Sequence, residues 1–151
     1  MPKRDIMIKP AGPDDLQALL DLYRHLNPDD PAIDPAWASD RFSTILAQPR
    51  MTIFVALAAD MPVASATLII TPNLTRNGAS YALVENVITH ADHRRKGYAG
   101  ALIRHACATA WEENCYKVML LTGSRNPATL RFYENCGFMR DKIGYQIRRP
   151  G

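Results

Sequence analysis

One stretch, residues 81–114, constrains the fold of this chain more than any other. "YALVENVIT" (81–89) predicts a strand of mixed polarity. "HRRKG" (93–97) follows as a basic turn that ends in glycine. A helix is then predicted from about residue 98 to 114, with Leu102, Ala106 and Ala110 on one face. A helix with one apolar face needs a layer to cover, and the preceding strand supplies part of it. The stretch therefore predicts a domain in which helices cover a sheet.

The rest of the chain supplies further strands and helices of ordinary length. Leucines and a tyrosine at helical spacing predict a helix that begins at Pro13 and ends near residue 26. We expect two more helices at 36–47 and 127–137, and strands at 6–11, 51–58, 63–70, 117–122 and 143–149. Strands 51–58 and 63–70 are predicted to form a hairpin. The order β-α-α-β-β-β-α-β-α-β indicates a mixed α/β or α+β fold, and we expect one domain over residues 1–151.

Composition excludes several classes of protein. A net charge of +3 suits a small anionic ligand but falls short of the basic stripe that nucleic-acid binding usually needs, so no nucleic-acid partner is predicted. No apolar run reaches the roughly 20 residues that span a bilayer, and the basic N-terminus lacks the apolar core of a signal peptide. The odd number of cysteines, without a CxxC pair, fits a reduced cytoplasmic protein (Cys107, Cys115 and Cys136). His90, His93 and His105 lack the surrounding ligands of a metal site, so no metal is predicted.

The basic turn allows two interpretations from its residues alone. The first amides of a helix have no intrahelical acceptor and lie at the positive end of its dipole, so a phosphate group fits there. Gly97 and Gly100 would let phosphate oxygens approach the backbone, beside the charges of residues 94–96. The turn is equally compatible with a helix start that carries exposed charges. Neither GxxxxGK[ST] nor GxGxxG is present.

Two motifs together resemble one known family. "RRKGYA" (94–99) is similar to the (Arg/Gln)-x-x-Gly-x-(Gly/Ala) signature of the GNAT superfamily of N-acetyltransferases, and it lies between a strand and a helix as in that family. "NPATLRFYENCGF" (126–138) resembles the Asn-x-x-Ala-x-x-Phe-Tyr-x-x-x-Gly-Phe segment of the same family. The two motifs bracket the strand predicted at 117–122. The region before residue 50 resembles the family only loosely.

The resemblance implies a fold, a cosubstrate and a set of binding residues. The implied fold has a mixed, mostly antiparallel sheet that splays between two strands and is flanked by helices. The implied reaction transfers an acetyl group from acetyl-CoA to a primary amine. The pyrophosphate of CoA would bind the turn and helix start, and its pantetheine arm would run along the strand and contact Asn126. The implied cofactor-binding residues are Val87, Ile88, Thr89, Arg94, Arg95, Lys96, Gly97, Tyr98, Ala99, Gly100 and Asn126.

The resemblance also suggests catalytic residues. Tyr133 matches the position that often protonates the leaving thiolate, and a phenol with a pKa near 10 keeps its proton at neutral pH. The alternative is a core aromatic beside Phe132. Glu85 and Asn86 resemble an acidic pair of small-amine members such as glucosamine-phosphate acetyltransferases, so Glu85 is a candidate general base and Asn86 a candidate substrate-binding residue. A structural ion pair of Glu85, with a chain of waters as base, is an equal alternative. Adjacent strand residues face opposite sides, so without a bulge only one of the two reaches the site.

The acceptor is the part of the function that the sequence leaves open. We expect direct transfer to the amine of a small molecule. A protein N-terminus or lysine is the second acceptor class. A different hypothesis is a domain that binds CoA as a sensor and does not catalyse transfer. Because the family frequently dimerises, a homodimer is compatible with the sequence.

Overall fold

The structure is a computed structural model that describes residues 5–151. Residues 1–4, which belong to the basic stretch read as lacking a signal peptide, lie outside the described part. The chain divides into a first unit that ends at Leu120 and a second unit, Leu121–Gly151. The expectation of a single domain over 1–151 stays a prediction.

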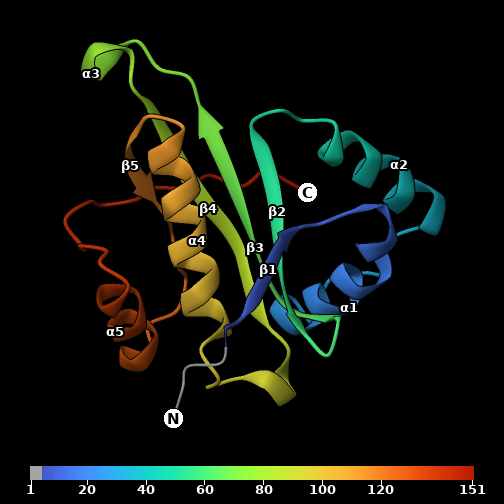
Figure 1. Cartoon of the computed structure of the whole chain (residues 1–151). Helices are drawn as coiled ribbons and strands as arrows, with labels where there is room; N and C mark the ends of the chain where they lie inside the picture. The colour runs from blue at the N-terminus through green and yellow to red at the C-terminus, as the bar shows by residue number, and fades with distance from the viewer. Residues whose placement is uncertain (1–4) are drawn as a thin grey trace. The chain divides into compact units, whose positions relative to one another are not determined.

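The first unit contains a five-stranded sheet in the order β1-β2-β3-β4-β5 (Figure 1). Neighbours among the first four strands are antiparallel, whereas β5 runs parallel to β4. The predicted hairpin is present as β2 and β3. The predicted mixed, mostly antiparallel sheet is therefore confirmed. The strands are β1 (Met7–Pro10), β2 (Met51–Ala58), β3 (Met61–Thr71), β4 (Ser80–Thr89) and β5 (Cys115–Met119).

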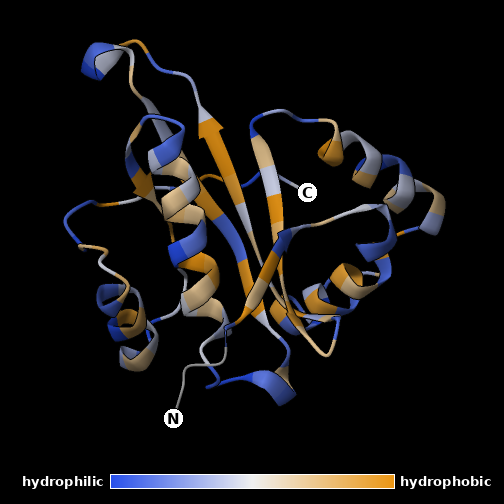
Figure 2. Cartoon of the chain, in the orientation of Figure 1, coloured by the Kyte–Doolittle hydropathy of each residue, from blue (hydrophilic) through white to orange (hydrophobic). Residues whose placement is uncertain are grey.

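Helices cover both faces of this sheet (Figure 1). On one face, α4 (Tyr98–Glu112) packs Leu102, Ala106 and Ala110 against small and branched residues of β2, β3 and β4. On the other, α1 (Leu16–Leu26) and α2 (Pro35–Leu46) pack Leu19 and Phe42 against β2. Figure 2 shows hydrophobic residues along the strands and hydrophilic ones at α3 (Thr75–Gly78) and at η2 (Ala91–His93). For α4 the periodicity thus predicted which side is buried, since Leu102, Ala106 and Ala110 all lie in the core.

Two segments differ in kind from the prediction, and the strand predicted at 117–122 is observed as β5 at Cys115–Met119 instead. Residues 143–149 form no strand, although Ile143, Tyr145 and Ile147 alternate as a strand requires; all three are more than four-fifths exposed. A strand exists only where a second strand takes up its backbone hydrogen bonds, and the second unit supplies none. It contains one helix, α5 (Pro127–Asn135). The loop after β3 contains the unpredicted turn α3, in which Arg76 and Asn77 adopt left-handed backbone angles.

Asp15, at the start of α1, forms hydrogen bonds with Lys9 on β1 and with the Gly12 backbone. The 3-10 turn η1 (Pro13–Asp15) leads into this helix. The Asp15 carboxylate accepts a hydrogen bond from the Gly12 backbone N–H and one from the Lys9 ammonium, each at 2.7 Å. Burial acts to raise the pKa of Asp15, but these two donors overcome it and hold the pKa below its usual value. Ionised Asp15 is therefore favoured by folding.

We expect Asp15→Ala to lower the free energy of unfolding by about 1–3 kcal/mol at pH 7, because it removes two hydrogen bonds to a charged group. A group whose pKa is lowered on folding contributes stability above its unfolded pKa of about 3.9, and this contribution is lost as the pH falls through the folded value. The deficit should therefore shrink in acid. Urea titrations from pH 7 to pH 3 measure it, with the exposed neighbour variant Asp14→Ala as control. A deficit that is equal at all pH values would contradict this account.

Candidate functional site

The site begins where β4 loses one of its two neighbours. β4 pairs with β5 from Ser80 to Leu83, and the last pair joins Leu83 to Met119. Beyond Leu83 the β5 side of β4 has no strand partner within the first unit, while the β3 side stays paired to Thr89. The predicted splay between these two strands is thus present. It leaves backbone N–H and C=O groups of β4 free to bind another extended chain.

A bulge lies on β4 at the predicted catalytic residues. Thr67 pairs with Glu85, and Ser65 pairs with Ile88. Between these two pairs β3 has one residue and β4 has two, so β4 carries one extra residue. Asn86 is the extra residue, with a left-handed φ of 52°. Asparagine tolerates this conformation better than most residues. Simple alternation, which would have let only one of Glu85 and Asn86 face the site, therefore does not hold here.

The bulge separates the roles of the strand's side chains. Val84 and Val87 both pack on the α4 side of the sheet, which alternation alone would not allow. Glu85 is half-buried and faces the α1 side, because it pairs with Thr67 and directly opposed residues share a face. Asn86 is exposed. Among the described residues, Glu85 has no hydrogen-bond or ion-pair partner, so the alternative of a structural ion pair finds no support.

The basic turn leads directly from β4 into α4. Arg95 and Gly97 both have left-handed backbone angles, with φ of 63° and 87°. The N–H groups of Tyr98, Ala99 and Gly100 lie in the first turn of α4 and therefore have no intrahelical acceptor. No side chain caps this end of the helix. Left-handed residues in such a turn gather backbone N–H groups into a concave anion site.

The charges of this turn are also unpaired. Arg94, Arg95 and Lys96 are exposed and form no ion pair with any residue from 5 to 151. His93 is half-buried beside Tyr98, and its Nδ1 atom is buried without a hydrogen-bond partner among the described residues. Charge and backbone donors thus converge on one turn, which supports the phosphate interpretation over that of a solvated helix start.

The histidines near the turn form a ring array. The centroids of His25 and His90 are 4.4 Å apart, and those of His90 and His93 are 5.7 Å apart. The Nδ1 atom of His90 accepts a hydrogen bond from the Asp92 N–H at 3.1 Å and so caps η2. Within the described residues no group of three or more histidine, cysteine, aspartate or glutamate side chains is placed to hold a metal ion. Ring contacts thus connect His25 through His90 and His93 to Tyr98 at the start of α4.

The remaining predicted residues lie in the second unit. Asn126 caps α5: its Oδ1 atom accepts from the Ala128 N–H at 3.0 Å, which leaves its amide NH2 for another contact. Tyr133 is half-buried, with its ring centroid 5.1 Å from that of Phe132. Burial raises the pKa of the Tyr133 phenol, and the Cys136 thiol acts in the same direction. The Tyr133 phenol therefore stays protonated at neutral pH.

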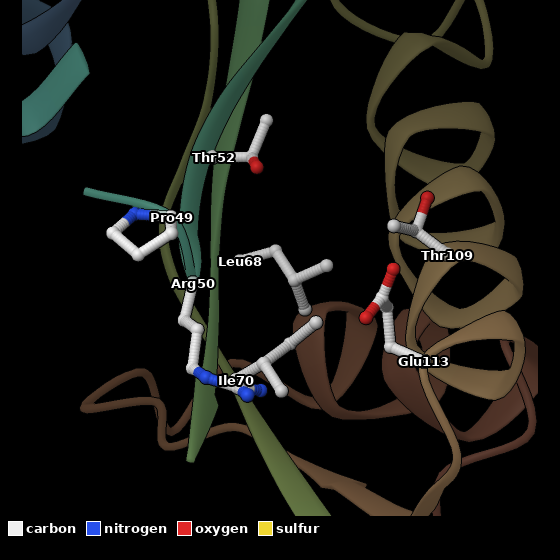
Figure 3. A pocket seen from close by; sticks show the side chains of 7 residues that line it. All are labelled: Pro49, Arg50, Thr52, Leu68, Ile70, Thr109 and Glu113. Carbon is white, nitrogen blue, oxygen red and sulfur yellow. The ribbon is translucent and has the colours of Figure 1, made fainter. Parts of the chain in front are cut away.

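A cavity of about 320 Å³ lies between the strands β2 and β3 and the C-terminal end of α4 (Figure 3). Leu68 and Ile70 form its floor, and Arg50 and Glu113 face each other across it without an ion pair. Thr109, on its wall, follows Tyr98 by about 16 Å along the helix at 1.5 Å per residue. None of the predicted site residues lines it, so this cavity is separate from the basic turn predicted to bind phosphate.

Two features of the site were not predicted. One is the bulge at Asn86. The other is a group of hydroxyls on the α1 face of the sheet, from Tyr23, Ser65 and Thr67. Ser65 and Thr67 are polar residues at alternate positions of an otherwise apolar strand, and this spacing places them on one face. That signal was available in the sequence, whereas the approach of Tyr23 from α1 was not.

Comparison with known proteins agrees with this geometry. A model of the Acetyltransferase (GNAT) family matches residues 18–138. The chain belongs to the GNAT acetyltransferase family. It is thus an acyltransferase of the N-acetyltransferase type, and the family resemblance seen in the two motifs is confirmed.

Three relatives illustrate the match. A glucosamine 6-phosphate N-acetyltransferase of Trypanosoma brucei brucei is 29% identical over 134 residues, which are 89% of this chain and 89% of that protein. One of Schizosaccharomyces pombe is 32% identical over 81 residues, 54% of this chain and 70% of that protein. A solved structure described as an acetyltransferase from Agrobacterium tumefaciens strain C58 has a TM-score of 0.92 and 52% identity, and covers 95% of this chain and 100% of that one.

We expect Gly97→Glu to weaken acetyl-CoA binding by at least about tenfold, a loss of roughly 1.4 kcal/mol. The new carboxylate would lie at the positive helix end and compete with the phosphate, and a side chain at a φ of 87° is strained. Isothermal titration calorimetry measures the dissociation constant.

Gly78→Glu is the matched control. Gly78 also has a positive φ, of 77°, and an added side chain there meets open space. It precedes β4 while Gly97 follows it, so the two glycines are separated by the length of that strand, about 30 Å. Equal loss of binding in both variants would point to a general effect of strain and would remove the anion site from the turn.

Proposed function

We propose that this protein transfers an acetyl group from acetyl-CoA to the primary amine of a small molecule, by direct transfer. The observation that carries the proposal is the continuity of two features: the unpaired edge of β4 after Leu83 runs directly into the uncapped, basic start of α4. Together they offer amide partners for an extended arm and donors for a pyrophosphate. Acetyl-CoA has both groups, and its thioester supplies the acetyl group.

The proposed binding residues follow from this arrangement. The backbone of Val87, Ile88 and Thr89 holds the pantetheine arm, and the Asn126 amide contributes a further hydrogen bond. The turn and helix start hold the pyrophosphate through backbone N–H groups and positive charge (Arg94, Arg95, Lys96, Gly97, Tyr98, Ala99 and Gly100). Gly100 is buried against the sheet, so its contribution is its backbone and its lack of a side chain.

Two proton transfers complete the proposed reaction. The amine gives up a proton to become nucleophilic, and we assign this to Glu85, whose half-buried carboxylate has no partner among the described residues. The leaving thiolate takes up a proton, which we assign to the Tyr133 phenol. Asn86, exposed at the bulge beside Glu85, is proposed to contact the acceptor.

The acceptor class rests on relatives and on the site. Two of the relatives are named for glucosamine 6-phosphate, a small amine. The acidic segment between α1 and α2 has exposed Asp29 and Asp30, which would attract a cationic amine. Asp34 is already used, since its carboxylate accepts from the Trp37 N–H at 3.0 Å and caps α2. We therefore favour a small amine over a protein N-terminus or lysine.

Location and assembly complete the proposal. Among residues 5–151, none of the helices combines the length and apolar character that crossing a bilayer requires. The odd cysteine count supports the proposal of a reducing, cytoplasmic environment. A homodimer stays a prediction.

Calorimetric titration with acetyl-CoA, followed by a panel of small amines with detection of released thiol, tests the proposed function. We expect micromolar binding and turnover with at least one amino sugar or related amine. Binding without turnover on that panel, or on peptides, would favour the sensor reading. No binding would overturn the proposal.

We expect Tyr133→Phe to lower kcat by about 100-fold, because a positioned acid is typically worth 10²–10⁴ in rate, while the affinity for acetyl-CoA changes little. Steady-state kinetics and calorimetry give the two quantities separately. Tyr145→Phe, at an exposed tyrosine of the same unit, is the control. A Tyr133→Phe enzyme with the wild-type kcat would remove Tyr133 from the acid role.

A further inference from the structure

The cavity on the α4 face of the sheet has opposite charges on its two walls (Figure 3). Its volume of about 320 Å³ is at the lower end of the range for ligand sites, which suits a small molecule. Arg50, directly before β2, and Glu113, the C-terminal cap residue of α4, face each other across it. The buried residues Leu68 and Ile70 lie at its base. The cavity thus has two charged ends and an apolar middle.

The wall on the β2 side offers hydrogen-bond donors. The Arg50 guanidinium has five N–H donors and no acceptor. Within residues 5–151 only the backbone carbonyl oxygen of Arg50 is used, by the Ile70 N–H at 2.8 Å, and its side chain forms no ion pair. Thr52 lines the same wall, and its hydroxyl has no hydrogen bond in that range. This wall suits a carboxylate, which can accept two parallel hydrogen bonds from an arginine.

The wall on the α4 side offers hydrogen-bond acceptors. The Glu113 carboxylate forms no ion pair with the part of the chain that the structure describes. Thr109, one helical turn earlier on the same side, donates its hydroxyl proton to the His105 carbonyl oxygen at 3.0 Å, so its oxygen can only accept another. The C-terminal end of a helix also carries a partial negative charge. This wall therefore suits an ammonium group.

The two charges lie near one another and still do not pair. Burial raises the pKa of the Cys115 thiol at the start of β5; Glu113 acts in the same direction and Arg50 opposes it. Both charges therefore lie within electrostatic range of one group. An exposed ion pair gains little free energy, because water solvates both partners well. A ligand that carries both opposite charges can satisfy each wall separately and cover the apolar base as well.

We propose that this cavity binds a small linear zwitterion of the ω-amino acid class. Its carboxylate binds Arg50, its ammonium group binds Glu113, and its methylene chain covers the apolar base. An α-amino acid fits less well, because it carries both charges at one end. The site lies on the sheet face opposite Glu85 and at the other end of α4 from the basic turn, so it does not rest on the proposed function.

The first experiment compares isomers by NMR titration of full-length ¹⁵N-labelled protein. The probes are 4-aminobutanoate, 5-aminopentanoate and 6-aminohexanoate, each paired with its linear α-amino isomer. We expect at least one ω-amino acid to bind in the millimolar range or tighter, to shift the amide resonances of Leu68, Ile70 and Thr109, and to bind at least about tenfold more tightly than its isomer. Hexylamine and hexanoate, which each lack one charge, should bind as weakly as the isomers. Equal binding of the isomers, or no binding of any ω-amino acid, overturns the proposal.

The second experiment removes one charge at a time. We expect Arg50→Gln and Glu113→Gln each to weaken binding of the best probe by at least about tenfold. Both side chains are exposed, so the variants should fold. Glu112→Gln, at an exposed neighbour that does not line the cavity, is the matched control and should bind like the wild type. Unchanged affinity in both cavity variants overturns the proposal. Resonance shifts centred on Glu85 would make the probe an acetyl acceptor and would also overturn the cavity site.

Discussion

The candidate site depends on how the two edges of β4 are used. On one edge, hydrogen bonds to β3 hold the strand along its whole length. On the other edge, the parallel partner β5 leaves after Leu83. Backbone groups that no strand pairs need other partners, and an extended ligand can supply them along this edge of β4. Because β4 continues into the turn at 94–97 and then into α4, the free edge and the proposed anion site lie on one continuous piece of chain.

Much of this arrangement could be predicted because it is local. The strand predicted at 51–58 is observed at those residues, and the strand predicted at 81–89 differs by a single residue. The basic turn is readable because bases, glycine and the start of a helix are adjacent in sequence. Glu85 was a candidate because a charged residue in an apolar strand is unusual. In each case a short pattern carries the physical cause.

The parts that could not be predicted depend on distant partners. Residues 143–149 satisfy the alternation of a strand, but pairing requires a second strand, and the pattern does not supply one. The bulge at Asn86 is set by the register of β4 against β3, which no window of β4 contains. The approach of Tyr23 to Ser65 and Thr67 requires α1 to pack on that face of the sheet. Sequence patterns thus predicted local elements better than the contacts between distant ones.

The α1 face of β3 carries a threonine that packing alone would not favour. Thr67 is flanked on its face by Ile53, and valine would fill the same volume without a hydroxyl. An unsatisfied buried hydroxyl costs about 1–3 kcal/mol, and Thr67 lacks the carbonyl partner that Ser65 has. A sheet face optimised for stability would therefore favour valine at this position. Threonine there is accounted for by the Tyr23 phenol, which approaches this face from α1 and lies beside the Thr67 and Ser65 hydroxyls.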